Sequence, residues 1–199
     1  MTPRLLVQAY AQGWFPMARS RHGEIGWCCP DPRAILPLEA FHVPHGLRRA
    51  LRKEPYVITR DRAFAQVIQA CAQPRAADPD TWISAPIIAA YTQLHELGLA
   101  HSVEAWRVSS VAGGADELVG GLYGVALGGA FFGESMFSNA PDASKICLVH
   151  LVEHLRVAGY VLLDVQFHNP HLEQFGIVEV RREDYLDRLA QAVQMGAVW

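Results

Sequence analysis

The chain has 199 residues, of which 51% are hydrophobic and 19% charged, and its formal net charge is −3. This composition excludes a disordered chain and a generally basic nucleic-acid-coating protein, and the length suffices for one core, or for a core with a small lobe. No apolar run approaches the ~18 residues of a membrane span, and the N-terminus lacks a signal-peptide pattern, so we expect a cytoplasmic protein without a membrane segment.

Residues 1–40 are dense in Gly, Pro and Trp and lack clean periodicity, which indicates a small irregular N-terminal lobe. Regular patterns fill residues 41–199, which we expect to form the main domain. They predict helices over residues 44–53, 61–72, 84–98, 142–159 and 182–195. Strand patterns between them cover residues 56–60, 101–109, 117–127, 131–138 and 160–167.

Several predicted helices have recognisable starts. Asp61 and Ser84 are the expected N-caps of two helices, and Asp142 or Ser144 that of the helix closed by Gly159. Strands are joined partly by hairpins and partly by helices. This arrangement predicts an α+β fold, with a mixed sheet that carries helices on both faces.

The stretch FFGESMFS, residues 131–138, places the carboxylate of Glu134 between apolar side chains. Burying a carboxylate costs several kcal/mol unless a partner compensates the charge. The partner of Glu134 is therefore expected to be structural, such as an Arg or a backbone amide, or to be the amine of a substrate.

A second polar pair interrupts the apolar run YVLLDVQF, residues 160–167. Side chains alternate along a strand, so Asp164 and Gln166 are expected on one face, about 7 Å apart. Glu134 and Met136 share a face by the same rule, and such positions are typical of a cleft at a sheet. The alternative is that Asp164 caps a loop or pairs with Arg181 or Arg182.

The segment HLVEH, residues 150–154, fits the H-x-x-E-H pattern of one class of zinc peptidase. A catalytic zinc also needs a third protein ligand, and no downstream residue has a recognised spacing. The four cysteines form neither a C-x-x-C pair nor a disulfide framework. We therefore expect no metal site, and the two histidines are interpreted as polar residues of a packed helix.

Two tryptophans and a basic segment are candidates for binding RNA. Trp27 and Trp82 lie beside Pro-rich or capping segments, where an indole can stack on an unpaired base or close the lobe onto the main domain. The basic segment is expected to hold phosphates, or else to be a solvated helix face, and consists of Arg48, Arg49, Arg52 and Lys53.

Motifs along nearly the whole chain carry a family resemblance. They include YAQGWFPM (10–17), WCCPDPR (27–33), TWIS (81–84), LVGGLYGVALGGAFFGESMFS (118–138), ASK (143–145) and DVQFHNPHLEQFG (164–176). With these motifs the sequence resembles the leucyl/phenylalanyl-tRNA protein transferases. Two departures are Cys28 and Cys29 in place of a second Trp and a Ser, and HLEQFGI in place of HLxSLGA.

The resemblance implies an enzyme that moves Leu, Phe or Met from aminoacyl-tRNA to the N-terminal Arg or Lys of a protein, which is then degraded through the N-end rule. It implies a small N-terminal lobe and an acetyltransferase-like (GNAT) domain, without a cofactor. We expect a monomer.

The resemblance also assigns roles to residues. Asp164 and Gln166 correspond to the catalytic pair, and the residues implied in substrate binding are Trp27, Trp82, Tyr91, Phe131, Glu134, Met136 and Asn169. Two alternatives are a CoA-dependent acyltransferase of the same fold class and a non-catalytic tRNA-binding module. The first is disfavoured because RVAGYV, residues 156–161, closes a helix and lacks the last small residue of a pyrophosphate loop.

Overall fold

The computed structural model describes residues 1–74, 80–111 and 113–199. Its helices are α1 (Pro3–Ala11), α2 (His45–Leu51), α3 (Phe64–Cys71), α4 (Ala85–Glu96), α5 (Ala143–Val157), α6 (Pro170–Glu173) and α7 (Arg182–Ala192). Its strands are β1 (Phe15–Ala18), β2 (Ile25–Cys28), β3 (Arg33–Ile35), β4 (Val57–Arg60), β5 (Ala100–Arg107), β6 (Glu117–Leu127), β7 (Ala130–Ser138), β8 (Leu162–Gln166) and β9 (Val178–Val180).

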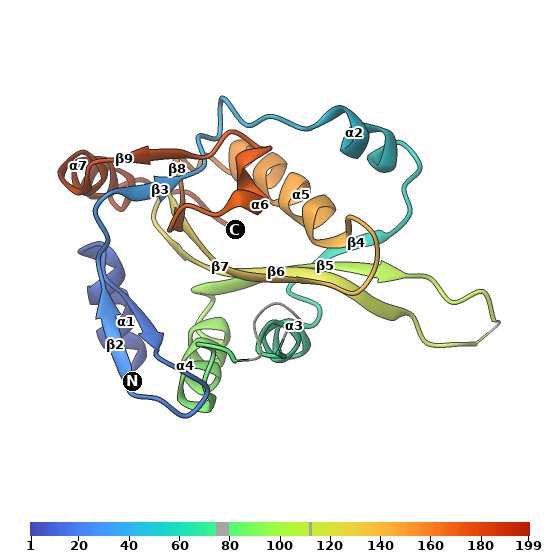
Figure 1. Cartoon of the computed structure of the whole chain (residues 1–199), viewed down its shortest axis with the longest axis horizontal. Coiled ribbons are helices and arrows are strands. Elements are labelled where there is room, and N and C mark those ends of the chain that lie inside the picture. Colours follow the sequence, from blue (N-terminus) through green and yellow to red (C-terminus); the bar gives the residue numbers. More distant parts are fainter. Residues whose placement is uncertain (75–79, 112) are drawn as a thin grey trace.

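The fold is organised around one large sheet. Seven strands follow the order β4-β5-β6-β7-β8-β3-β9, and β1 and β2 form a separate two-stranded sheet. The neighbours β7 and β8 are parallel, whereas the other pairs of the large sheet are antiparallel. Helix α5 covers one face and helices α3 and α4 the other (Figure 1). This arrangement confirms the predicted α+β class, while the acetyltransferase-like label stays a prediction.

The parallel pair creates an opening in the sheet. A parallel connection needs a crossover, which α5 supplies between β7 and β8. The two strands pair from Ala130 with Leu162 to Phe132 with Asp164, and the register ends there. Beyond this point β7 continues to Ser138, so its second half and the chain beyond β8 are free to line a pocket.

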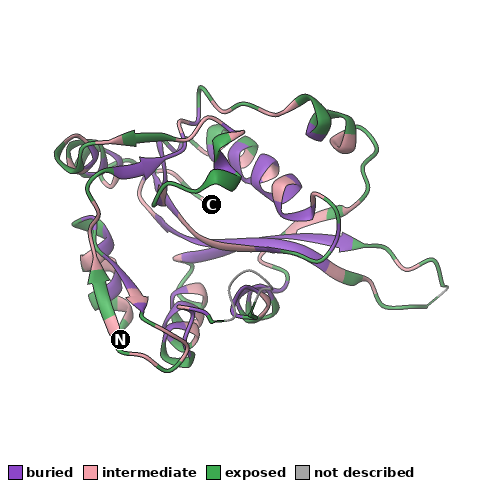
Figure 2. Cartoon of the chain, viewed as in Figure 1, coloured by how far each residue is buried: buried purple, intermediate pink, exposed green. Residues whose placement is uncertain are grey.

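Two apolar clusters hold the layers together. One lies under α1, α3, α4 and α7 and includes Tyr10, Tyr91 and Phe132. The other packs α5 against the opposite face and includes Phe131. The sheet and the inner faces of the helices are buried, whereas the outer faces of α2 and α7 are exposed (Figure 2).

The predicted helices and strands are confirmed, with ends that differ by a few residues. The prediction that Asp61 caps a helix is wrong, because α3 begins at Phe64 and its N-cap is Ala63. The Asp61 carboxylate instead accepts one hydrogen bond from Ser102 N at 2.8 Å. Its other oxygen pairs with His101 Nδ1, also at 2.8 Å. Ser84 is the N-cap of α4, but its side chain makes no capping hydrogen bond.

Residues 1–40 contain a helix, a hairpin and one strand of the large sheet. Helix α1 and the hairpin β1-β2 form the lobe, and β3 inserts between β8 and β9. The domain boundary near residue 40 stays a prediction. None of the helices in the described ranges combines the length and apolar character needed to cross a membrane.

Candidate active site

A cavity of about 330 Å³ opens where β7 and β8 cease to pair. Its apolar wall includes Met17, Met136, Leu148 and Leu163. The polar groups around it include Glu134, Gln166, His168 and Asn169, with Thr81 and Trp82 on the opposite segment. Of the described residues that line it, two are carboxylates, Asp80 and Glu134, and none is Lys or Arg.

A β-bulge directs Glu134 toward this cavity. In the pairing of β6 with β7, Tyr123 lies opposite Ser135 and Gly124 lies opposite Gly133, so Glu134 is an extra residue with no cross-strand partner. Bulges re-aim side chains and are common beside active sites. A Cβ on Gly124 would lie 2.3 Å from the carbonyl oxygen of Phe132, so the partner strand needs glycine here.

The bulge changes the predicted alternation on β7. Glu134 contacts residues of the α1 and α4 side, whereas Met136 packs with the cluster under α5. Both residues nevertheless line the same cavity. Glu134 and Met136 therefore lie on opposite faces of the sheet but line the same cavity, and strand alternation alone could not predict this.

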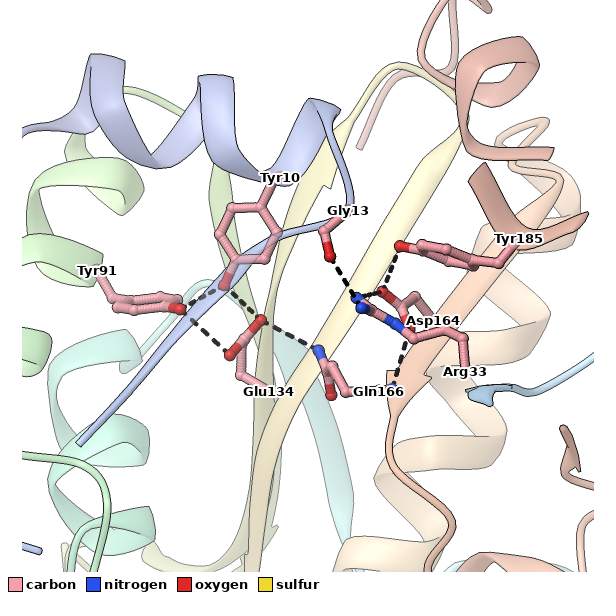
Figure 3. A network of polar contacts seen from close by, with 8 residues as sticks. All are labelled: Tyr10, Gly13, Arg33, Tyr91, Glu134, Asp164, Gln166 and Tyr185. Atoms are coloured by element: carbon pink, nitrogen blue, oxygen red, sulfur yellow. Dashed lines mark hydrogen bonds and ion pairs between the residues drawn. The ribbon is translucent and has the colours of Figure 1, made fainter. Parts of the chain in front are cut away.

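Glu134 is bound by hydroxyl and amide groups rather than by a cation. Tyr10 Oη donates to Glu134 Oε1 at 2.6 Å, and Tyr91 Oη donates to Oε2 at 3.2 Å. The two hydroxyl oxygens also lie within hydrogen-bonding distance of one another, but each hydroxyl has a single proton, so Tyr91 can donate either to Glu134 or to Tyr10. Gln166 Nε2 lies 3.4 Å from Oε1 (Figure 3). Both tyrosines are fully buried, one on α1 and one on α4.

The environment of Glu134 raises its pKa to about 7. Burial is the largest cause, and the nearby charge of Asp164 adds to it, while the hydrogen bonds from Tyr10 and Tyr91 oppose the shift. Burial beside this carboxylate also raises the pKa of both tyrosines. The tyrosines therefore remain proton donors in the hydrogen bonds to Glu134 across the neutral range.

Asp164 is bound in a different way, by a buried arginine. Arg33 Nε donates to Asp164 Oδ1 at 2.9 Å and its terminal nitrogen to Oδ2 at 2.6 Å, and both side chains are fully buried. Tyr185 Oη donates to Oδ2 at 2.8 Å. Burial opposes the charge on Arg33, but the hydrogen bonds and charge of Asp164 outweigh it and raise the arginine pKa.

Arg33 also joins the lobe to the sheet. Its second terminal nitrogen donates to the Gly13 carbonyl at 2.9 Å, and its guanidinium lies over the rings of Phe15 and Tyr185, 4.9 Å and 4.4 Å from their centroids. The expected partners Arg181 and Arg182 instead pair with acidic residues on the surface. The predicted pairing of Asp164 with Arg181 or Arg182 is therefore wrong, because β3 places Arg33 beside β8, whereas Asp164 does accept a hydrogen bond from the backbone of the turn that follows it.

Gln166 is held in an unusual backbone conformation. Its φ is +62°, in the left-handed region that non-glycine residues rarely adopt and that often marks functional sites. Its backbone N–H donates to Asp164 Oδ1 at 2.9 Å, which stabilises the turn. The Gln166 side chain consequently points toward Glu134, whereas that of Asp164 points toward Arg33 (Figure 3).

The structure brings some of the predicted site residues together and separates others. Trp82, Glu134, Met136, Gln166 and Asn169 all line the cavity. Asn169 also accepts a hydrogen bond from His171 N as the N-cap of α6.

Phe131 does not face the cavity as expected. It precedes the bulge, and strand alternation places it with the α5 cluster, where its ring stacks on Trp199 at 5.3 Å between centroids. Trp27 is 37% exposed on β2. It lies on the hairpin whose other strand brings Phe15 and Met17 to the cavity.

The basic segment lies on α2 and the turn after it. Arg48, Arg49, Arg52 and Lys53 are all exposed. Arg48 Nε donates to the Val43 carbonyl at 2.8 Å. Within residues 1–74, 80–111 and 113–199, no ion pair neutralises these four side chains, which leaves their charge available to a polyanion.

The histidines of HLVEH have separate surroundings on α5. His150 lies 3.7 Å from Glu153, and the His154 ring packs edge-on against Trp199. Across the described part of the chain, no three His, Cys, Asp or Glu side chains are grouped closely enough to hold a metal ion.

Three residues of the polar network were not predicted. Tyr10 and Arg33 lie inside the motifs YAQGWFPM and WCCPDPR, which predicted a family but no contacts for these side chains. Tyr185 lies in the terminal helix without any distinctive pattern. An arginine beside a Pro-rich turn in an otherwise apolar strand is the one local signal that could have indicated a buried ion pair.

Comparison with known proteins identifies the family. The model of the leucyl/phenylalanyl-tRNA protein transferases matches residues 35–190, and that of their N-terminal domain matches residues 1–31. Relatives named leucyl/phenylalanyl-tRNA–protein transferase include one from Hyphomonas neptunium, 53% identical over 98% of this chain and 73% of the relative. Those from Salinibacter ruber and Paramagnetospirillum magneticum are 51% and 55% identical, covering 100% and 97% of this chain and 83% and 90% of theirs.

The mixed sheet, the cavity and these matches define an enzyme of the aminoacyltransferase class. The chain belongs to the leucyl/phenylalanyl-tRNA protein transferase family.

Proposed function

We propose that this enzyme transfers Leu, Phe or Met from aminoacyl-tRNA to proteins that begin with Arg or Lys, and so marks them for degradation through the N-end rule. One observation carries the proposal: an apolar cavity contains the carboxylate of Glu134, and its described lining has no cation. Such a cavity suits an apolar donor side chain and a positively charged acceptor.

The donor is proposed to lie along the apolar wall. The terminal adenine stacks on Trp82 at the cavity and, across the β1-β2 hairpin, on Trp27. The amino-acid side chain lies against Met136 and the leucines around it. An apolar pocket discriminates by size at only about 1–3 kcal/mol per methylene, which fits the acceptance of Leu, Phe and Met.

The acceptor amine is proposed to lie against Gln166. The Gln166 carbonyl can accept a hydrogen bond from the amine, while Asp164 acts as a positioning residue through the Gln166 backbone. An aminoacyl ester is already activated, so placement of the amine next to the ester supplies much of the rate. The basic segment is proposed to contact phosphates of the tRNA.

The test uses labelled Leu-tRNA, labelled acetyl-CoA and a peptide that begins with Arg. Transfer of label from the tRNA ester to the peptide is the expected result, with a matched peptide beginning with Glu as control. Label arriving from acetyl-CoA would establish a CoA-dependent acyltransferase instead. Binding of the tRNA without any transfer would establish a tRNA-binding module.

Trp82→Ala tests the donor site. Base stacking is worth about 1–3 kcal/mol, so the variant should bind aminoacyl-tRNA roughly 5- to 150-fold more weakly. Trp14→Ala is the control, since Trp14 is 43% exposed and is absent from the described lining of the cavity. Equal weakening by both variants would contradict stacking on Trp82.

Reversing the charge of Arg49 and Arg52 tests the basic segment. The double variant should bind all tRNA sequences more weakly and show a shallower salt dependence. Puromycin-like substrates, which lack the acceptor stem, should be used normally. An equal loss with both substrates would show that the segment is structural.

The cellular setting follows from the same proposal. The enzyme is proposed to act as a monomer in the cytoplasm, where aminoacyl-tRNA is found. No disulfide joins the four cysteines, all of which lie in the described residues, and this agrees with a reducing compartment.

A further inference from the structure

We propose that Glu134 accepts the proton of the acceptor amine, and that Tyr10 and Tyr91 position it for this task. The inference rests on the proposed function and assigns a catalytic role within it. It places the proton-accepting role on Glu134, while Asp164 remains the residue that fixes Gln166.

Access to the cavity separates the two carboxylates. Glu134 lines the cavity beside Gln166, whereas Asp164 is fully buried and absent from the described lining. A group that takes a proton directly must come within hydrogen-bonding distance of the amine. Glu134 faces the cavity in which the amine is proposed to lie, whereas Asp164 could act only through another group.

The capacity to accept a further hydrogen bond also favours Glu134 over Asp164 as the proton acceptor. An ionised carboxylate offers about four acceptor positions. Asp164 receives four donors: Nε and a terminal nitrogen of Arg33, the Tyr185 hydroxyl and the Gln166 backbone N–H. Glu134 receives three, the longest being the 3.4 Å contact from Gln166 Nε2. An amine can use the remaining position or displace the weak contact.

The basicity of Glu134 matches the task. Its pKa is about 7, close to the value near 8 of a free α-amine, whereas an ordinary carboxylate is a far weaker base. Proton transfer is most efficient when the two pKa values are similar. The titratable and charged groups that face Glu134 are Tyr10 on α1, Tyr91 on α4, Tyr123 on β6, Arg33 on β3 and Asp164 on β8.

The tyrosines set the position of the carboxylate. Each oxygen of Glu134 can receive one tyrosine hydroxyl, so rotation of the carboxylate would break two hydrogen bonds. These hydrogen bonds also favour the ionised form and so lower the pKa, against the larger effect of burial. Tyr10 and Tyr91 are therefore positioning residues that tune the base (Figure 3).

The proton balance of the reaction is complete with this base. The acceptor enters as an ammonium with three protons, and the product amide keeps one of them. Glu134 takes the first proton, the nitrogen forms a bond to the ester carbonyl carbon, and the bond from that carbon to the ribose oxygen breaks. The ribose oxygen takes the second proton, and Glu134 then releases the first to solvent.

The main experiment measures single-turnover transfer of Leu from saturating Leu-tRNA to a saturating Arg-peptide as a function of pH. The wild-type rate should rise with pH through about 7, the pKa of Glu134. Glu134→Gln should lower the rate at neutral pH by about 100-fold or more, the usual contribution of general base catalysis. It should also abolish the rise centred near 7.

Tyr10→Phe tests whether Tyr10 tunes the base, because a purely structural role would leave the midpoint of the pH–rate profile unchanged. Loss of the hydroxyl removes a hydrogen bond that favours the ionised form, so the midpoint of the pH profile should move upward. Tyr91→Phe should move it in the same direction by less, because its contact is longer. The control is Tyr56→Phe, whose hydroxyl donates to the Pro141 carbonyl away from the cavity.

The outcomes separate this inference from the proposed function. If the wild-type enzyme transfers no label from Leu-tRNA, the proposed function fails. If it does, but Glu134→Gln keeps the wild-type rate and profile, or Tyr10→Phe leaves the midpoint unchanged, the assignment of Glu134 as the base is overturned alone. A destabilised Glu134→Gln variant would leave the tyrosine variants to decide.

Discussion

Two carboxylates of the polar network, Asp164 on β8 and Glu134 on β7, show how neighbouring strands can give the same functional group opposite properties. Asp164 is fully buried and bonded to an arginine. Glu134 borders the cavity and is bonded to neutral hydroxyls, and its pKa is raised to about 7. A carboxylate with a fixed cation serves to hold structure, while one without a cation is ready to receive the charge of a substrate.

The difference arises from the two strands that flank them. On the β8 side, β3 pairs Ile35 with Asp164, and Arg33 at the start of the same strand bonds to the Asp164 carboxylate. On the β7 side, the bulge opposite Gly124 turns Glu134 toward α1 and α4, which contribute tyrosines. The following variants test how far this contrast holds.

The largest expected effect is that of Arg33→Met. It leaves Asp164 buried without its cation, which typically costs about 3–5 kcal/mol in the free energy of unfolding. Urea denaturation measures the loss. The control is Arg107→Met, which removes an ion pair with Glu117 in which both side chains are more than half exposed, and should cost under about 1 kcal/mol. Similar losses in both variants would contradict a structural role for the Arg33 pair.

A smaller effect is expected from pH on Glu134. Its pKa is raised from 4.5 to about 7, so between these values the folded protein keeps a proton that the unfolded chain has lost. Stability contributed by this group therefore falls as pH rises through that window. The free energy of unfolding of Glu134→Gln should therefore rise by about 1–3 kcal/mol relative to that of wild type as the pH increases from about 5 to about 8.

Urea denaturation of wild type and Glu134→Gln at both pH values gives the four free energies of unfolding. Subtracting the wild-type change with pH from that of the variant removes the contributions of the other titratable groups. Glu96→Gln, a change at an exposed position of α4, is the control and should show no such difference. A relative loss of stability in Glu134→Gln at the higher pH would contradict the raised pKa.

The smallest effect is expected from Tyr185→Phe. It removes the hydroxyl that donates to Asp164 Oδ2 but leaves Arg33 and the aromatic ring in place. The loss in the free energy of unfolding should be about 1 kcal/mol by urea denaturation. A loss as large as that of Arg33→Met would show that the hydroxyl, rather than the arginine, compensates Asp164.

The sequence predicted the elements of the fold better than the contacts of the site. Local periodicity was sufficient to place the strands that carry Glu134 and Asp164, and motif resemblance indicated Gln166 beside them. The partners Arg33 and Asp164 are separated by 131 positions, and no local pattern encodes such a pairing.

The bulge was equally hidden in the sequence. It depends on the pairing of two strands and on the space left by Gly124, and neither is visible in the FGES segment alone. Phe131 illustrates a related limit, because the motif names a residue type but does not say which face of the strand it occupies. Burial of Arg33 could be recognised once β3 was known to lie between two strands.

The Arg33 contacts also constrain the order in which the enzyme can mature on the ribosome. Its guanidinium joins Gly13 in the lobe, Asp164 in β8 and, by stacking, Tyr185 in α7. Contacts between distant segments form late, since the intervening chain must first be made and closed. In the nascent chain Arg33 therefore has no carboxylate partner until residue 164 has emerged from the ribosome. Its contact with the Tyr185 ring can form only after residue 185 has emerged. The contacts that hold Asp164, and through it the backbone of Gln166, are therefore complete only once the chain has been made through residue 185.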